Sequence, residues 1–174
     1  MNRIQVDDCA VDKVRSTLNA APDINADTMV LLFYTCIERN QRDSCALMVE
    51  RGFRRFADFP RWDAFIQLVR DNELDYIQQL VKWGVPFKSM HANGCTPLDM
   101  AITHNHLRIA EYMLELGCTV LHTPNWPLAL LLQRKQNDMI RLLNRHGQLK
   151  ITPGAVKLAQ LSHNTDMVAY LTGV

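Results

Sequence analysis

Apolar residues between residues 91 and 120 recur with the period of two amphipathic helices joined by a polar turn. The first apolar set has the spacing of one helix face, with Leu98, Ala101 and Ile102. The second set has the i, i+1, i+4, i+5 spacing of another, with Ile109, Ala110, Met113 and Leu114. Because residues three and four apart share one side of a helix, this segment is predicted to be a helix–turn–helix unit.

The residues that flank these apolar sets are typical of helix boundaries. Thr96 can cap the first helix through its hydroxyl, and Pro97 suits the first helical position. Asn105 can adopt the left-handed backbone that follows a helix, and Gly117 is predicted to end the second helix. Asp99 is interpreted as an acid at the start of the first helix rather than as a catalytic carboxylate.

The same pattern recurs along most of the chain. Four glycines, spaced 30 to 33 residues apart, end successive units: Gly52, Gly84, Gly117 and Gly147. A last unit aligns with the one before it at an offset of 28 residues, and residues 11–25 look like the second half of a repeat. Such units bury their apolar faces only against neighbouring units, so the pattern predicts a stack of repeats.

The unit from His91 to Val120 resembles the ankyrin repeat. Its Gly-Cys-Thr-Pro-Leu-Asp-Met-Ala stretch at 94–101 is similar to the family's G-x-T-P-L-H-x-A, and Gly-Cys at 117–118 occupies the place of G-A. The resemblance implies an all-α ankyrin-repeat solenoid of about four full repeats, with a half-repeat as N-terminal cap and a short C-terminal repeat. The approximate units of this single domain, residues 1–174, are 1–28, 29–60, 61–93, 94–123, 124–151 and 152–174.

The resemblance also implies a protein-binding module with two working surfaces. On the concave face of the first helices, the expected contact residues are Arg39, Arg70, Asp71, His104 and Arg134. At the hairpins between repeats, the expected contact residues are mainly aromatic or basic: Arg54, Arg55, Phe56, Phe59, Arg61, Trp62, Trp83, Phe87 and Met90. Aromatic residues and arginine are enriched at binding hot spots. The alternative is that the concave residues form a solvated face and that the aromatic residues pack beneath irregular hairpins.

Three functional classes are compatible with a repeat array of this length. The first is a binder of one specific partner, such as an inhibitor or an immunity-type protein that neutralises a toxin or an enzyme. The second is a scaffold or targeting adaptor that positions a larger assembly or a substrate. The third, an enzyme, is not expected, because the chain lacks G-x-x-x-x-G-K-[ST], G-x-G-x-x-G, H-E-x-x-H and G-x-S-x-G motifs. No cofactor is expected.

Composition narrows the partners further. The 19 Lys and Arg residues almost balance the 18 Asp and Glu residues, which argues against nucleic acid as a partner. The longest apolar stretches are too short to span a bilayer, so we expect no membrane partner, a cytoplasmic location and a monomer in isolation. His104 and His106 are expected to point to different sides, which argues against a zinc site. The five cysteines are expected to be reduced, with Cys118 at a buried position and Cys95 in a loop.

Overall fold

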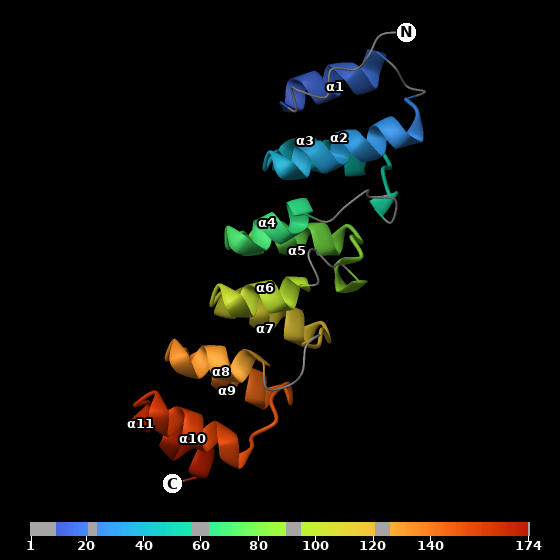
Figure 1. Ribbon diagram of the computed structural model, residues 1–174. Coiled ribbons are helices and arrows are strands. Elements are labelled where there is room, and N and C mark those ends of the chain that lie inside the picture. Colours follow the sequence, from blue (N-terminus) through green and yellow to red (C-terminus); the bar gives the residue numbers. More distant parts are fainter. Residues whose placement is uncertain (1–9, 21–23, 57–62, 90–94, 121–125, 174) are drawn as a thin grey trace. The chain divides into compact units, whose positions relative to one another are not determined.

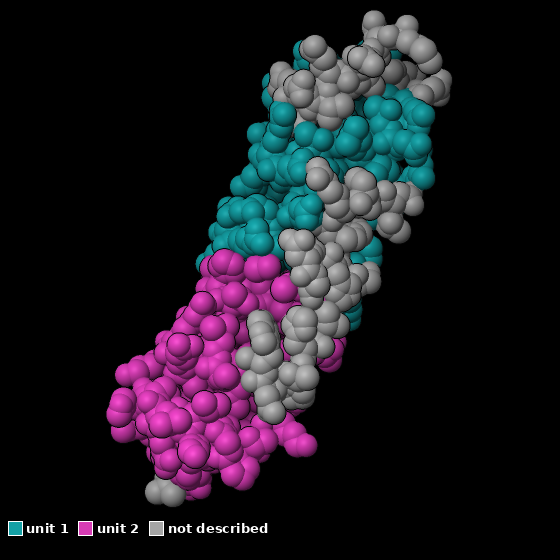
Figure 2. Space-filling model, viewed as in Figure 1, with its two compact units in different colours: residues 1–92 teal, residues 93–174 magenta. Residues whose placement is uncertain are grey.

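The structure of the protein is a computed structural model that describes residues 10–20, 24–56, 63–89, 95–120 and 126–173. Over these residues the chain forms short α-helices, most of them in consecutive pairs (Figure 1). Two compact units divide the chain, unit 1 with residues 1–92 and unit 2 with residues 93–174 (Figure 2). No helix of the described ranges is long and apolar enough to cross a membrane.

In the part of unit 1 that the structure describes, one helix precedes two helix pairs. The helices are α1 (Val11–Ala20), α2 (Ala26–Glu38), α3 (Arg42–Glu50), α4 (Asp63–Arg70) and α5 (Leu74–Lys82), followed by the short 3-10 helix η2 (Phe87–Ser89). Helix α2 pairs with α3, and α4 pairs with α5. Helix α1 packs on α3 and buries Val14 and Leu18. Its contact with α3, a second helix, agrees with the prediction that residues 11–25 form the second half of a repeat.

Unit 2 contains three consecutive helix pairs. They are formed by α6 (Pro97–Thr103) with α7 (Leu107–Glu115), α8 (Trp126–Gln133) with α9 (Asn137–Arg145), and α10 (Pro153–Leu161) with α11 (Thr165–Thr172). First helices pack on first helices, as α8 does on α10, and second helices pack on second helices, as α7 does on α9. The array is therefore all-α and repetitive, as predicted from the periodicity.

The turn inside each pair has one shared backbone geometry. A single non-glycine residue with φ between 50° and 60° follows the first helix: Asn40, Asn72, Asn105, Lys135 and His163. In the first of these turns the amide of Gln41 donates to the carbonyl of Cys36 at 2.8 Å, the 6→1 hydrogen bond of a Schellman motif. The left-handed conformation predicted for Asn105 is confirmed, and it is a property of every described pair.

Glycines end the second helices in the same way. Gly52, Gly84, Gly117 and Gly147 all have positive φ, from 66° to 96°. After α3, the amide of Phe53 donates to the carbonyl of Met48 at 3.0 Å, again closing a 6→1 bond. The predicted role of these glycines as helix ends is confirmed, because a positive φ is unfavourable for residues with a Cβ atom.

The start of α6 is also as predicted. The hydroxyl of Thr96 accepts from the amide of Asp99 at 3.0 Å, and the carboxylate of Asp99 accepts from the amide of Thr96 at 3.0 Å. This reciprocal capping box satisfies two main-chain donors that the helix itself leaves without partners. Asp99 is fully buried in this role.

Candidate protein-binding surfaces

The hairpin that follows α3 has a buried aromatic base. Phe53 and Phe56 are buried, and their ring centroids lie 4.8 and 5.4 Å from that of Phe33 in α2. The side chain of Phe56, predicted to contact a partner, therefore belongs to the core of unit 1. The alternative interpretation, in which aromatic residues pack beneath an irregular hairpin, describes this position correctly.

The arginines of the same hairpin remain at the surface but make contacts within the chain. The guanidinium of Arg54 donates to the carbonyls of Val49 and Phe53 at 2.7 and 2.6 Å, so it covers the end of α3. Arg55 forms an ion pair with Asp27 at 3.8 Å. The other predicted contact residues of this hairpin, Phe59, Arg61 and Trp62, lie outside the described residues.

The hairpin after α5 also has a buried aromatic residue at its base. Phe87 is buried, and its ring stacks on that of Phe65 with a centroid distance of 6.1 Å. Trp83 is half-buried and its ring lies 6.3 Å from that of Phe33. Phe87 is thus a core residue rather than a free contact, because its position after the glycine turns it back toward α4. Met90 lies outside the described residues.

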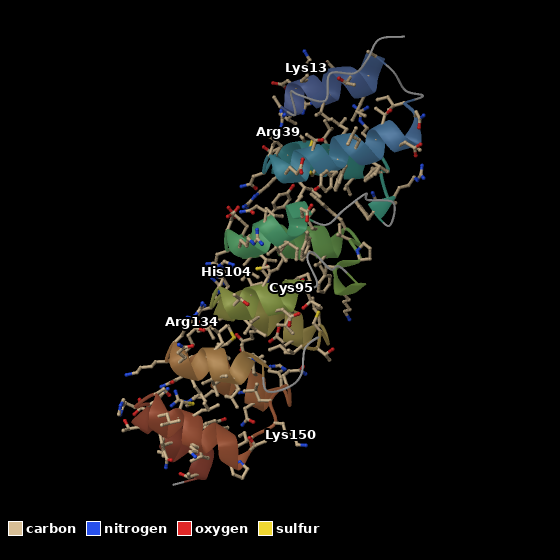
Figure 3. The ribbon with its side chains drawn as sticks, in the orientation of Figure 1. Lys13, Arg39, Cys95, His104, Arg134 and Lys150 are labelled. Carbon is tan, nitrogen blue, oxygen red and sulfur yellow. The ribbon has the colours of Figure 1, made fainter. Side chains whose placement is uncertain are left out.

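The residues of unit 1 that are predicted to lie on the concave face are found near the ends of the first helices. Arg39, Arg70 and Asp71 are all exposed, and Figure 3 shows Arg39 at the end of α2. The carboxylate of Asp71 accepts from the side-chain amide of Gln67 at 2.9 Å. Arg70 and Asp71 place opposite charges next to one another at the C-terminal end of α4.

In unit 2 the predicted concave residues His104 and Arg134 are exposed at the ends of α6 and α8 (Figure 3). Arg134 donates to the carbonyl of Thr103 at 2.9 Å. The prediction that His104 and His106 point to different sides is wrong, because their rings stack with centroids 5.8 Å apart. The left-handed residue Asn105 lies between them, so the side-chain directions of a continuous helix do not apply.

A second surface of unit 2 is an apolar groove of about 540 Å³ between α8 and α10. We name it the α8/α10 groove, and its lining residues are Ala129, Leu130, Leu132, Gln133, Leu158, Leu161 and Ser162. Leu158 and Leu161 are 43% and 69% exposed, so two apolar side chains of the same groove are open to solvent.

Sequence reasoning missed Leu158 and Leu161. The signal was present, since the offset of 28 residues that aligns the last two units places Leu158 on Leu130 and Leu161 on Gln133. Leu130 and Gln133 line the same groove. Carried into the last unit, this alignment would have placed leucines at both of these positions on α10.

Next to this groove lies a polar pocket of about 480 Å³ that we name the α8-end pocket. Its lining residues are Asn105, Leu107, Arg134, Lys135, Gln136, Asn137, Asp138 and Arg141. Arg141 pairs with Asp138 at 3.3 Å. Among the residues that the structure describes, no carboxylate pairs with Arg134 or Lys135, so this pocket has a net positive charge.

Cysteine positions agree only in part with the predictions. Cys36 and Cys45 are buried in unit 1, whereas Cys118 is half-buried rather than fully enclosed.

The hydroxyl of Tyr76 donates to Sγ of Cys45 at 3.0 Å. Burial, with Cys45 as the next largest cause, raises the pKa of Tyr76 well above its usual value. In the described ranges no three His, Cys, Asp or Glu residues are grouped as metal ligands.

Comparison with known proteins identifies one segment of this array. The protein-family model of the ankyrin repeat matches residues 93–126, the segment that contains α6 and α7. No curated protein matches the chain.

Proposed function

We propose that this ankyrin-repeat chain recognises one specific partner and acts by covering part of that partner's surface. Ankyrin repeats generally bind other proteins. An inhibitor of a toxin or an enzyme, including an immunity-type protein, is the form of this function that we favour. Such a role needs a shaped surface and no reacting groups.

The observation that carries the proposal is the α8/α10 groove beside the α8-end pocket. Two exposed leucines line the first, and the second is lined by Arg134 and Lys135, which pair with no carboxylate of the described residues. When a partner covers exposed apolar side chains, the free energy of binding becomes more favourable by about 25 cal/mol for each Å² removed from water. A combined apolar and charged surface of this kind favours one partner over others, because both components must be matched.

The position of these residues supports the first-helix face as the interface rather than the hairpin after α3. Of the hairpin residues that the structure describes, Phe56 is buried and Arg54 covers a helix end. Arg55 remains as an exposed candidate for a secondary contact.

Affinity capture of the tagged protein from its native source, followed by mass spectrometry, tests the proposal. The variant is Leu158→Ser with Leu161→Ser. The matched control is Leu31→Ser, because Leu31 is an exposed leucine of α2 in unit 1, outside the groove. We expect one stoichiometric partner on the unsubstituted protein and on the control, with recovery lost on the double variant.

Two other outcomes count against the proposal in different ways. Equal recovery on the double variant would show that the interface lies elsewhere. Recovery of no stoichiometric partner would contradict the binding function itself. An assay of the recovered partner then separates the two roles, because an inhibitor lowers the partner's activity in a one-to-one complex whereas a scaffold leaves it unchanged.

A further inference from the structure

We infer that the segment bound by unit 2 is an amphipathic α-helix with apolar side chains along one face and carboxylates at one end. The inference rests on the proposed function and specifies the chemistry of the partner. It depends on the apolar lining of the α8/α10 groove and on the cations of the adjoining α8-end pocket.

The two surfaces adjoin at the C-terminal end of α8, where consecutive residues line one and then the other. Gln133 lines the groove, and Arg134 and Lys135 line the pocket immediately after it. A ligand that fills the groove along α8 therefore reaches the pocket at the end of that helix. The apolar and the charged parts of the ligand must follow one another in the same order.

The groove itself favours a helix over an extended peptide. Its walls are mainly the side chains of Leu130, Leu132, Leu158 and Leu161, with few groups that can hydrogen-bond to a main chain. An extended segment in such a groove would bury unpaired amide groups, whereas a helix satisfies these groups internally. The side chains at i and i+4 of a helix form a ridge that fits between two packed helices.

The charge of the α8-end pocket indicates which residues of the bound helix follow its apolar side chains. Three cations face one carboxylate there, and that carboxylate, Asp138, pairs with Arg141. One N–H group of Arg134 donates a hydrogen bond to the carbonyl of Thr103, and a guanidinium has further N–H groups for a ligand. Lys135 is exposed, and among the described residues no carboxylate pairs with it. An acidic end of the bound helix would complement these two cations.

Selection of peptides tests this chemistry directly. A phage-displayed library of helical peptides, randomised on one face and at both ends, is selected against the whole protein. A synthetic peptide of the most enriched sequence is then titrated by fluorescence anisotropy. We expect enriched sequences with Leu, Met or Phe at i and i+4 followed by Glu or Asp at one end.

Variants assign the binding to the site. Leu158→Ser with Leu161→Ser should raise the dissociation constant about tenfold or more, since central apolar contacts dominate such interfaces. Lys135→Asp should raise it about three- to tenfold and reduce its salt dependence. Asp retains the tolerance for positive φ that this position requires. Circular dichroism melts check that each variant is folded.

The matched control is Lys150→Asp, which makes the same change of charge in the same unit. Figure 3 shows Lys150 at the opposite end of the helices from Arg134. Equal effects of Lys135→Asp and Lys150→Asp would overturn the acidic part of the inference. Enrichment of neutral or basic peptides, or no enrichment over the starting library, would overturn it entirely. A captured partner that depends on Leu158 and Leu161 would then leave the proposed function standing without this inference.

Discussion

At the scale of single residues, backbone conformation sets the length and direction of each helix. Every described helix pair turns at one residue with positive φ, and the second helices α3, α5, α7, α9 and α11 each end at a glycine with positive φ. The first-helix turns use Asn, Lys or His at this position, although residues with a Cβ adopt it at a cost. The glycines are therefore structural requirements of the array rather than contact residues.

Replacement of one such glycine should cost stability through the backbone alone. A Cβ atom at Gly84 would meet no heavy atom within 4 Å, but the residue has φ of +96°. We expect Gly84→Ala to lower the free energy of unfolding by about 1–2 kcal/mol, measured by chemical denaturation.

Gly154→Ala provides the control for this prediction. Gly154 lies in α10 without a positive φ, and its Cβ would lie 3.6 Å from Oγ1 of Thr152, an ordinary contact. This substitution should leave stability unchanged or raise it by about 0.4–1 kcal/mol. Similar losses for both variants would contradict the backbone explanation.

At the scale of helices, side-chain contacts at equivalent positions join neighbouring pairs, with an ion pair in one unit and hydrogen bonds between amides in the other. In unit 1, Arg42 pairs with Glu73 and lies 5.0 Å from the ring centroid of Tyr76. In unit 2, Asn137 and Asn164 exchange two side-chain hydrogen bonds of 3.2 and 2.7 Å. Both links join the first residue of one second helix to the residue that precedes the next second helix.

These two links should differ in their response to salt. Arg42 and Glu73 are about one-third exposed, so we expect Glu73→Gln to cost about 0.5–1 kcal/mol at low salt. The cost should decrease near 1 M NaCl, where charges are screened over about 3 Å. Asn164→Ala should cost about 1–2 kcal/mol at both salt concentrations. Denaturation curves at two salt concentrations measure the difference, and an equal salt response of the two variants would contradict it.

Tyr76 links α5 to α3 and should make stability depend on alkaline pH. Burial raises the pKa of its phenol, so the folded protein keeps a proton that the unfolded chain loses near pH 10. Its contribution is therefore complete below pH 10 and decreases as the pH rises above 10, by up to about 1.4 kcal/mol per pH unit.

Tyr76→Phe should reduce this alkaline slope, at the cost of the hydrogen bond to Cys45. The measurement is the free energy of unfolding between pH 8 and pH 11. Tyr170→Phe is the control, since it changes an exposed tyrosine and leaves Tyr76 in place. An unchanged slope in Tyr76→Phe would show that other groups cause the alkaline response.

At the scale of the whole molecule, each repeat should have its own local stability, so that the chain does not unfold as one cooperative block. In repeat arrays each unit contacts only its neighbours, so destabilisation is strongest near the altered repeat. Leu131 in α8 and Met48 in α3 are both fully buried, one in each compact unit. They offer a reciprocal pair of substitutions.

Leu131→Ala and Met48→Ala should each lower the free energy of unfolding by about 2–5 kcal/mol. Hydrogen exchange followed by mass spectrometry should then show faster exchange mainly in α8–α11 for the first variant and mainly in α1–α3 for the second. Uniform acceleration in both variants would contradict a distributed array and indicate a single cooperative block.

Periodicity predicted most of the fold because it reflects local physical chemistry. The apolar phase, the left-handed Asn105, the terminal glycines and the Thr96 cap each depend on a few adjacent residues. The ankyrin-type unit was recognisable for the same reason. The aromatic hairpins were harder to interpret, since the type of residue alone does not say whether a phenylalanine faces solvent or its own core.

The sequence by itself therefore determined that the chain is an array of helix pairs, because each pair is specified by local spacing and caps. Only the tertiary structure decided which of the predicted contact residues are exposed and can bind a partner. It placed Phe56 and Phe87 in the core, stacked His104 on His106, and left Leu158 and Leu161 at the surface. The physical reason is that burial and side-chain stacking depend on packing between segments that are distant in sequence or separated by a left-handed turn.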